Sequence, residues 1–161
     1  IYTGEDTLSL HDALPISLCP TSNLFLDSGF FHFQEAQTHN MLHGLASDVG
    51  GGTSFSPFQT MHAAYTVGRQ SVGRDGHSLS AQQLWWLHTA GAAQALGLSG
   101  ICGNLAVGCD ADFVVLNLQA TPLLARRTAA ANSLEEQMFA MIVLGDDRLV
   151  DRVVVNGRLH A

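Results

Sequence analysis

The 161-residue chain contains no lysine, and its seven basic residues are all arginines. Its 14 acidic residues leave a formal net charge of −7 at pH 7, and no basic cluster is larger than the pair Arg126-Arg127. Nucleic acids and anionic membrane surfaces are bound through clustered positive charge. The sequence therefore argues against nucleic acid and membrane as partners.

Long apolar runs are also missing. No stretch approaches the roughly 20 apolar residues of a membrane-spanning helix, and the start at Ile1 lacks the basic region of a secretion signal. The cysteines Cys19, Cys102 and Cys109 are odd in number and do not have zinc-finger spacing. We therefore expect reduced thiols and a cytoplasmic location.

Hydrophobic residues make up 47% of the chain, which is enough for one domain with a sizeable core. The pattern predicts strands at 17–20, ending at Pro20, and at 43–47, with a helix over about 30–41 between them. Two segments of capping-box form, Ser56-Pro57-Phe58-Gln59 and Ser80-Ala81-Gln82-Gln83, predict helices from 57 to about 69 and from 81 to about 96. Gly97 is expected to close the second helix.

The pattern changes after about residue 98. Residues 112–116 and 150–155 predict strands, and a helix is expected from Ser133 to about residue 144. Asn156-Gly157 is the preferred two-residue hairpin turn, so the chain is expected to return as a strand over 158–160. The predicted fold class is therefore α/β, with a strand–helix–strand–helix part followed by a small sheet module.

Asp48 is the most informative residue. It ends a short apolar run and precedes Gly50-Gly51-Gly52, and catalytic groups of α/β barrels lie at the C-terminal ends of strands. A carboxylate there can bind a metal or accept the proton of a metal-bound water. It can equally cap a glycine-rich turn, and the pattern alone leaves both interpretations open.

The three glycines and two histidines near Asp48 have plainer interpretations. Without a lysine the glycines cannot form a P-loop, so we expect them to provide positive φ angles and close backbone approach. His39 and His43 have helical i, i+4 spacing, but no glutamate follows His39 as in a zincin helix. About five extended residues, roughly 16 Å, separate His43 from Asp48. We expect both histidines to be solvated or at a helix end.

Several segments resemble a known family in the order expected for it. Cys19-Pro20-Thr21-Ser22-Asn23-Leu24-Phe25-Leu26 and residues 47–56 resemble strands seven and eight of the guanine deaminases, which belong to the amidohydrolase superfamily. Residues 103–116 resemble the return of that superfamily into its small β domain. Residues 121–127 and 144–148 resemble guanine deaminases more narrowly. The resemblance extends from Ser17 to the C-terminus.

The resemblance implies the C-terminal part of a distorted (β/α)8 amidohydrolase barrel plus part of a small β-sandwich domain. It implies one Zn2+ per active site and hydrolysis of a small-molecule purine, guanine, to xanthine and ammonia. Asp48 matches the strand-eight aspartate, which implies a catalytic, metal-binding and substrate-binding role. The full-length parent is expected to be a homodimer. The alternatives are another purine, pterin or triazine aminohydrolase, or a non-catalytic dimerising fragment.

The same resemblance implies missing parts. The family's His-x-His zinc pair is absent, a catalytic zinc needs about three protein ligands, and a complete barrel needs roughly 250 residues. We therefore expect the C-terminal third of an enzyme, inactive alone. Residues 1–16 are expected to be a non-native leader, similar to translated sequencing adapter, or a divergent one, and to pack poorly. Residues 17–98 are expected to form the last two βα units with a trailing helix, and 99–161 the C-terminal β-module with a helix.

Overall fold

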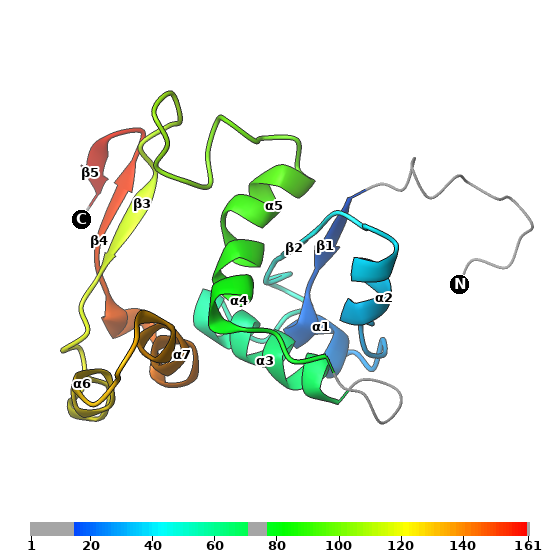
Figure 1. Cartoon of the computed structure of the whole chain (residues 1–161), viewed down its shortest axis with the longest axis horizontal. Helices are drawn as coiled ribbons and strands as arrows, with labels where there is room; N and C mark the ends of the chain where they lie inside the picture. The colour runs from blue at the N-terminus through cyan, green and yellow to red at the C-terminus, as the bar shows by residue number, and fades with distance from the viewer. Residues whose placement is uncertain (1–14, 71–76, 161) are drawn as a thin grey trace, which may run out of the picture.

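The computed structural model describes residues 15–70 and 77–160. An α/β part built around two parallel strands lies beside a small antiparallel sheet and its helices (Figure 1). The chain is thus a mixed α/β protein, as predicted. Most of the expected leader, residues 1–14, lies outside the described residues.

The two parallel strands are β1 (Ile16–Leu18) and β2 (His43–Leu45), paired with Ile16 opposite His43 and Leu18 opposite Leu45. Both strands are shorter than predicted, and β1 begins one residue before the expected domain boundary. The prediction that Pro20 ends a strand was wrong, because Pro20 is the first residue of helix α1 (Pro20–Phe25). A proline suits that position, since the first helical N–H needs no intrahelical partner.

Helix α2 (Phe33–Thr38) joins the two βα units and is shorter than the predicted helix over 30–41. Phe33 and Ala36 are its buried residues, whereas Phe30 lies before the helix and is exposed. Asn40 takes a φ of 52°, a left-handed conformation that cannot continue a right-handed helix. This turn leads the chain into β2.

Helix α3 (Pro57–Arg69) confirms the predicted helix over 57–69. The helix predicted over 81–96 is interrupted, and forms α4 (Ala81–His88) and α5 (Ala90–Ala95). At the break, Thr89 has φ −128° and ψ −101°, and its hydroxyl donates to the carbonyl of Trp85 at 2.7 Å. A threonine that bonds back to the preceding turn competes with regular helical geometry, which the apolar spacing did not reveal.

The C-terminal part contains helices α6 (Pro122–Ala129) and α7 (Leu134–Leu144) and the 3-10 helix η2 (Asp147–Leu149). Its sheet has the order β3-β4-β5, formed by β3 (Phe113–Leu116), β4 (Val150–Val155) and β5 (Arg158–His160). Asn156 and Gly157 have φ angles of 49° and 71°, as a hairpin turn of this type requires. The predicted strands, helix and turn of this part are confirmed, whereas α6 was not predicted.

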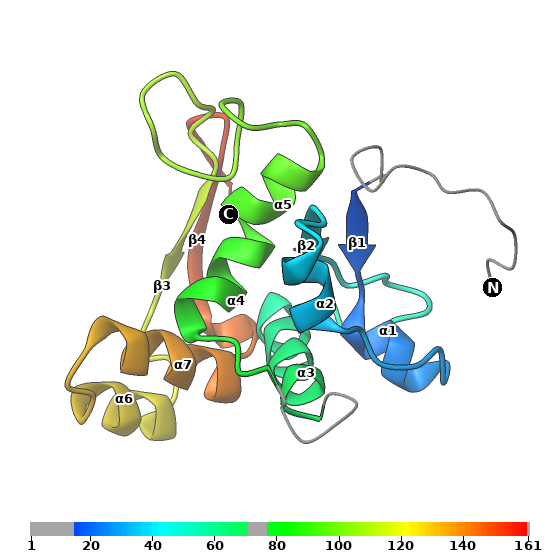
Figure 2. The ribbon, with the colours of Figure 1, turned by 45° about the vertical axis from the view of Figure 1, so that its right-hand side comes forward.

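One hydrophobic core joins the two parts. Helix α7 packs against α3 and α4, and α5 lies on β2, in agreement with the rotated view (Figure 2). The core is formed by buried apolar side chains of both parts, among them Leu18, Leu45, Phe58, Met61, Leu84, Leu124, Ile142 and Leu149. Within the described ranges, no helix has both the length and the apolar character needed to cross a bilayer.

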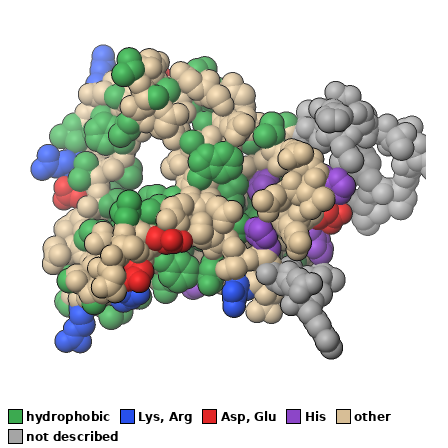
Figure 3. All heavy atoms as spheres, viewed as in Figure 1, with side chains coloured by type: hydrophobic (Ala, Val, Ile, Leu, Met, Phe, Trp, Pro, Cys, Tyr) green, Lys and Arg blue, Asp and Glu red, His purple; other side chains and the backbone are tan. Residues whose placement is uncertain are grey.

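The small sheet remains open to solvent. Apolar side chains reach the surface over it (Figure 3), and those at least 40% exposed include Phe113, Val114, Val115, Val155 and Leu159. Successive strand residues point to opposite faces, so the adjacent Phe113, Val114 and Val115 expose both faces of β3. The predicted β-sandwich and barrel are thus not completed by the described residues and stay predictions.

Candidate functional site

The candidate site lies at the C-terminal edge of β1 and β2. Because the strands are parallel and in register, both of their carboxyl ends meet at this edge. The amide of Ala46 donates to the carbonyl of Leu18 at 2.8 Å and extends the pairing beyond β2. Cys19 and helix α1 follow one strand here, and Asp48 follows the other.

Asp48 lies three residues beyond the end of β2 with its backbone in the left-handed region, at φ 48°. The residue is exposed, and its Oδ2 accepts a hydrogen bond of 2.7 Å from the hydroxyl of Ser22 in α1. Its carbonyl accepts a second bond from the amide of Gly52. The side chain is therefore held by the neighbouring βα unit, while the backbone closes the turn.

The three glycines after Asp48 have separate roles. Gly50 has a φ of 118°, which L side chains rarely adopt. A Cβ on Gly51 would meet Asp48 Oδ2 at 2.7 Å, and one on Gly52 would collide with the carbonyl oxygen of Ser47. The expectation of positive φ and close backbone approach is confirmed.

The thiol of Cys19 lies in the same neighbourhood. It donates to the carbonyl of Ser17 at 3.6 Å. Burial raises the pKa of Cys19 and the negative charge of Asp48 raises it further. Both effects favour the protonated thiol, which is not the form in which cysteine binds metals.

The described residues do not by themselves fit a zinc site. Catalytic zinc has about three protein ligands, and in residues 15–70 and 77–160 no three His, Cys, Asp or Glu side chains lie close enough to hold one ion. At the strand edge, the side chains around Asp48 are the neutral hydroxyl of Ser22 and a thiol favoured in its neutral form. Of these three side chains, Asp48 is the one that carries a carboxylate.

His39 and His43 differ in their surroundings. His39 is exposed and follows the last residue of α2, as expected. The expectation for His43 was wrong, because its ring is partly buried 5.4 Å from the ring of Phe31, and its Nδ1 lies 2.9 Å from the carbonyl of Met41. The rings of Phe31, just before α2, and Phe33, at the first position of α2, cover this histidine, which the local spacing did not show.

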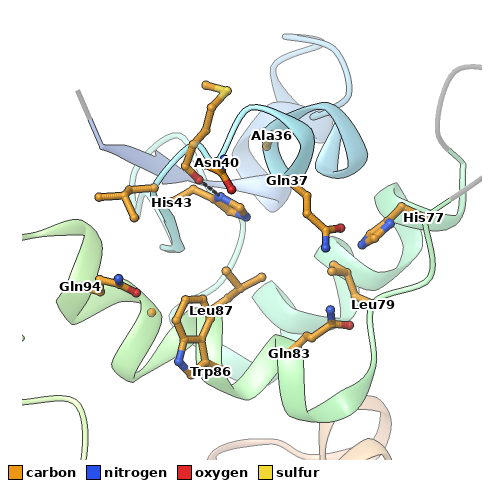
Figure 4. A pocket seen from close by; sticks show the side chains of 13 residues that line it. Ala36, Gln37, Asn40, His43, His77, Leu79, Gln83, Trp86, Leu87 and Gln94 are labelled. Atoms are coloured by element: carbon orange, nitrogen blue, oxygen red, sulfur yellow. Dashed lines mark hydrogen bonds between the residues drawn. The ribbon is translucent and has the colours of Figure 1, made fainter. Parts of the chain in front are cut away.

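His43 lines a pocket of about 370 Å³ between α2 and α4 (Figure 4). Gln37, His77 and Gln83 lie around the same opening. This pocket is at the beginning of β2, whereas Asp48 follows the end of that strand. The pocket and the carboxylate therefore belong to opposite ends of the strand pair.

Comparison with known proteins identifies the class. Residues 2–160 match the sequence pattern described as the Amidohydrolase family. The chain belongs to the amidohydrolase family.

Within that class, the chain is similar to guanine deaminases. It is 42% identical to guanine deaminase of Escherichia coli (strain K12) over 144 aligned residues. The aligned segment covers 89% of this chain and 32% of that protein. A solved structure of E. coli guanine deaminase superposes with a TM-score of 0.86 at 41% identity, covering 91% of this chain and 34% of the other. The similarity favours a segment of a guanine deaminase over the predicted alternatives.

Two further structures bear on ligands. Guanine deaminase from C. acetobutylicum, solved with guanine bound in its active site, has a TM-score of 0.75 at 26% identity, covering 90% of this chain and 33% of the other. An adenosine deaminase from Xanthomonas campestris with bound zinc has a TM-score of 0.76 at 25% identity, covering 90% and 31%. The chain spans about a third of the length of the curated relatives it matches, at 32% of E. coli guanine deaminase.

Ser22 is the site residue that the sequence did not single out. Its bond to Asp48 joins residues 26 positions apart. The available signal was the segment from Cys19 to Leu26, which contains Ser22 and resembles guanine deaminases.

Proposed function

We propose that this chain is part of a guanine deaminase, which hydrolyses guanine to xanthine and ammonia, and that Asp48 is its contribution to the active site. The observation that carries the proposal is the position of Asp48, at the shared carboxyl edge of two parallel strands, in a chain 42% identical to E. coli guanine deaminase. This edge is where α/β barrels place their catalytic groups. The guanine-bound structure of the C. acetobutylicum relative supports guanine as substrate.

The proposed metal is zinc, supported by the zinc-bound X. campestris deaminase. Asp48 would be one ligand, and the other ligands would come from outside the described residues. The proposed complete enzyme is a cytoplasmic homodimer. Residues 17–98 would be its last two barrel units and residues 99–161 its β-module.

The isolated chain should be inactive, because one carboxylate cannot hold a catalytic zinc. Purified chain with added zinc is expected to form no xanthine from guanine. Sustained turnover that is abolished by a chelator would contradict the inactivity and would require a complete site in this chain.

A chimera tests the function itself. Residues 15–160 replace the matching third of E. coli guanine deaminase, and xanthine formation is measured. Asp48→Asn should lower kcat by at least about 100-fold, the minimum typical of a lost acid–base group. Asparagine keeps the side-chain shape and tolerates the positive φ.

Asp27 provides a matched control. It is also an exposed aspartate in the left-handed region, with φ 55°. Asp27→Asn should leave kcat unchanged. Equal activity of the Asp48→Asn and parent chimeras would refute the assigned site. A folded chimera that deaminates another purine or a pterin but not guanine would refute the assigned substrate.

A further inference from the structure

We infer that Ser22 is a positioning residue for the Asp48 carboxylate, and that the lack of a side chain at Gly51 leaves room for their contact. The inference rests on the proposed function, because it assigns Ser22 a role in the reaction in which Asp48 takes part. It concerns the orientation of an acid that is otherwise exposed at the end of a strand.

The topology brings the two residues together. Leu18 of β1 pairs with Leu45 of β2, so the segments that follow leave the same edge side by side. Pro20 starts α1 almost immediately after β1, which places Ser22 in the first turn of that helix. Asp48 is reached at a similar distance beyond β2. A shift of either strand would separate the two side chains.

The donor is fixed although the acceptor is exposed. Ser22 is only 4% exposed, and α1, which carries it, packs against α3. An ionised carboxylate can only accept, so the hydroxyl of Ser22 donates its proton to Asp48 Oδ2 across 2.7 Å. Hydrogen bonds to a charged acceptor are short and are stronger than neutral ones. Asp48 is thereby held by a donor that is itself rigidly packed.

Gly51 lies directly against this pair. A Cβ at Gly51 would be 2.7 Å from Asp48 Oδ2, 3.1 Å from Ser22 Oγ and 3.3 Å from Leu26 Cδ1. Any larger residue must displace the carboxylate, the hydroxyl or both. The absence of a side chain at Gly51 is therefore part of the same arrangement.

The bond defines what each carboxylate oxygen does. Oδ2 is held by Ser22, and no protein donor is found for Oδ1 among the described side-chain hydrogen bonds, so Oδ1 remains available for the active site. Without the hydroxyl, the exposed side chain would redistribute among its staggered rotamers. Because a displacement of about 1 Å at a reacting group can cost on the order of 100-fold in rate, loss of Ser22 should reduce catalysis without removing a substrate contact.

The experiment compares Ser22→Ala, Ser22→Cys and Thr21→Val in the chimera. Ser22→Ala should lower kcat by about 10- to 100-fold, the usual effect of losing an outer hydrogen-bond partner of a metal-binding group, and KM should stay unchanged. Ser22→Cys keeps a weak donor and should recover part of kcat. Thr21 is the control, because its buried hydroxyl has no hydrogen-bond partner among the residues that the structure describes, so Thr21→Val should retain the parent kcat.

A spectroscopic measurement separates this inference from the proposed function. The carboxyl 13C resonance of Asp48, assigned by its loss in Asp48→Asn, should move in Ser22→Ala and stay in place in Thr21→Val. The measurement is made on the 161-residue chain and on the chimera. An inactive parent chimera would refute the proposed function, while an unmoved resonance would refute the contact. A Ser22→Ala kcat equal to that of Thr21→Val would overturn the positioning role.

Discussion

Replacing serine with alanine should lower the free energy of unfolding at one helix start but not at a second helix start with the same sequence pattern. Ser80 and Ser56 each precede a helix and each have a glutamine three residues later. At α4 the full capping box forms, since Ser80 Oγ accepts from the amide of Gln83 at 3.2 Å and the Gln83 side chain accepts from the amide of Ser80 at 2.8 Å. Ser80→Ala should therefore lower the free energy of unfolding by about 1 kcal/mol.

The predicted cap at Ser56 was wrong. Its amide donates to the hydroxyl of Ser54 at 2.9 Å, so the glutamine side chain is not needed there. The Ser56 hydroxyl makes no cap bond, and it is buried without a hydrogen-bond partner in the described part of the chain. A buried polar group in this state costs about 1–3 kcal/mol. Ser56→Ala should therefore leave the free energy of unfolding unchanged or raise it.

Urea unfolding of the chain, followed by far-UV circular dichroism, measures both effects. In thermal unfolding the loss at Ser80 corresponds to roughly 2–4 °C in Tm for a chain of this size. Gln83→Ala is the companion variant and should reproduce part of the loss, because it removes the reciprocal bond. An equal loss of stability in Ser56→Ala and Ser80→Ala would contradict this prediction, since the two hydroxyls would then be energetically equivalent.

Three other expectations concern the site, a partly buried histidine and the strand edge. Gly51→Ala should reduce kcat of the chimera by up to about 100-fold, because the Asp48 carboxylate must move to admit the methyl group. Val49→Ala, in the same turn, should leave kcat unchanged. Equal kcat values for the two variants would contradict the proposed contact between residue 51 and the carboxylate. Burial lowers the pKa of His88 in the folded chain below its usual value of 6.5. Below pH 6.5 the unfolded chain therefore takes up a proton at this histidine before the folded chain does, and the free energy of unfolding falls. Above pH 6.5 the contribution of His88 to stability is complete. His88→Gln should flatten this dependence in urea unfolding, and an unchanged slope would count against it. Within the described residues β1 pairs with β2 only, and the edge left open should promote association. Light scattering that rises with concentration would show this association, whereas a monomer with a sharp, reversible, two-state melt would argue against it.

The sequence predicted those elements whose signals are local. Helix α3 follows from Pro57 at its first position and from apolar spacing, and helix α7 follows from the capping residue Ser133. The hairpin follows from the turn chemistry of Asn156-Gly157. Helix α6 had a comparable signal, a threonine followed by proline at the first helical position, and the Thr121 hydroxyl does accept from the amide of Leu124 at 3.2 Å. The pair Thr121-Pro122 is therefore a local signal for α6.

Other features depend on contacts between distant segments. His43, at the start of β2, is covered by the rings of Phe31, which precedes α2, and Phe33, at the first position of α2. The position of Asp48 at a strand end was predicted from local pattern, but its bond to Ser22 requires the pairing of β1 with β2. A metal site whose ligands come from several strands also depends on contacts between distant segments. The sequence of one segment therefore cannot predict such a site.

The left-handed backbone at Asp48 limits which residues selection can place there. Glutamate carries the same charge, but only glycine, asparagine and aspartate visit this conformation routinely. The backbone conformation at residue 48 therefore favours aspartate over glutamate, independently of the reaction. Homologues that have lost the acid during evolution should have drifted to asparagine or glycine, and descendants bearing glutamate should be rare unless the turn itself has been rebuilt.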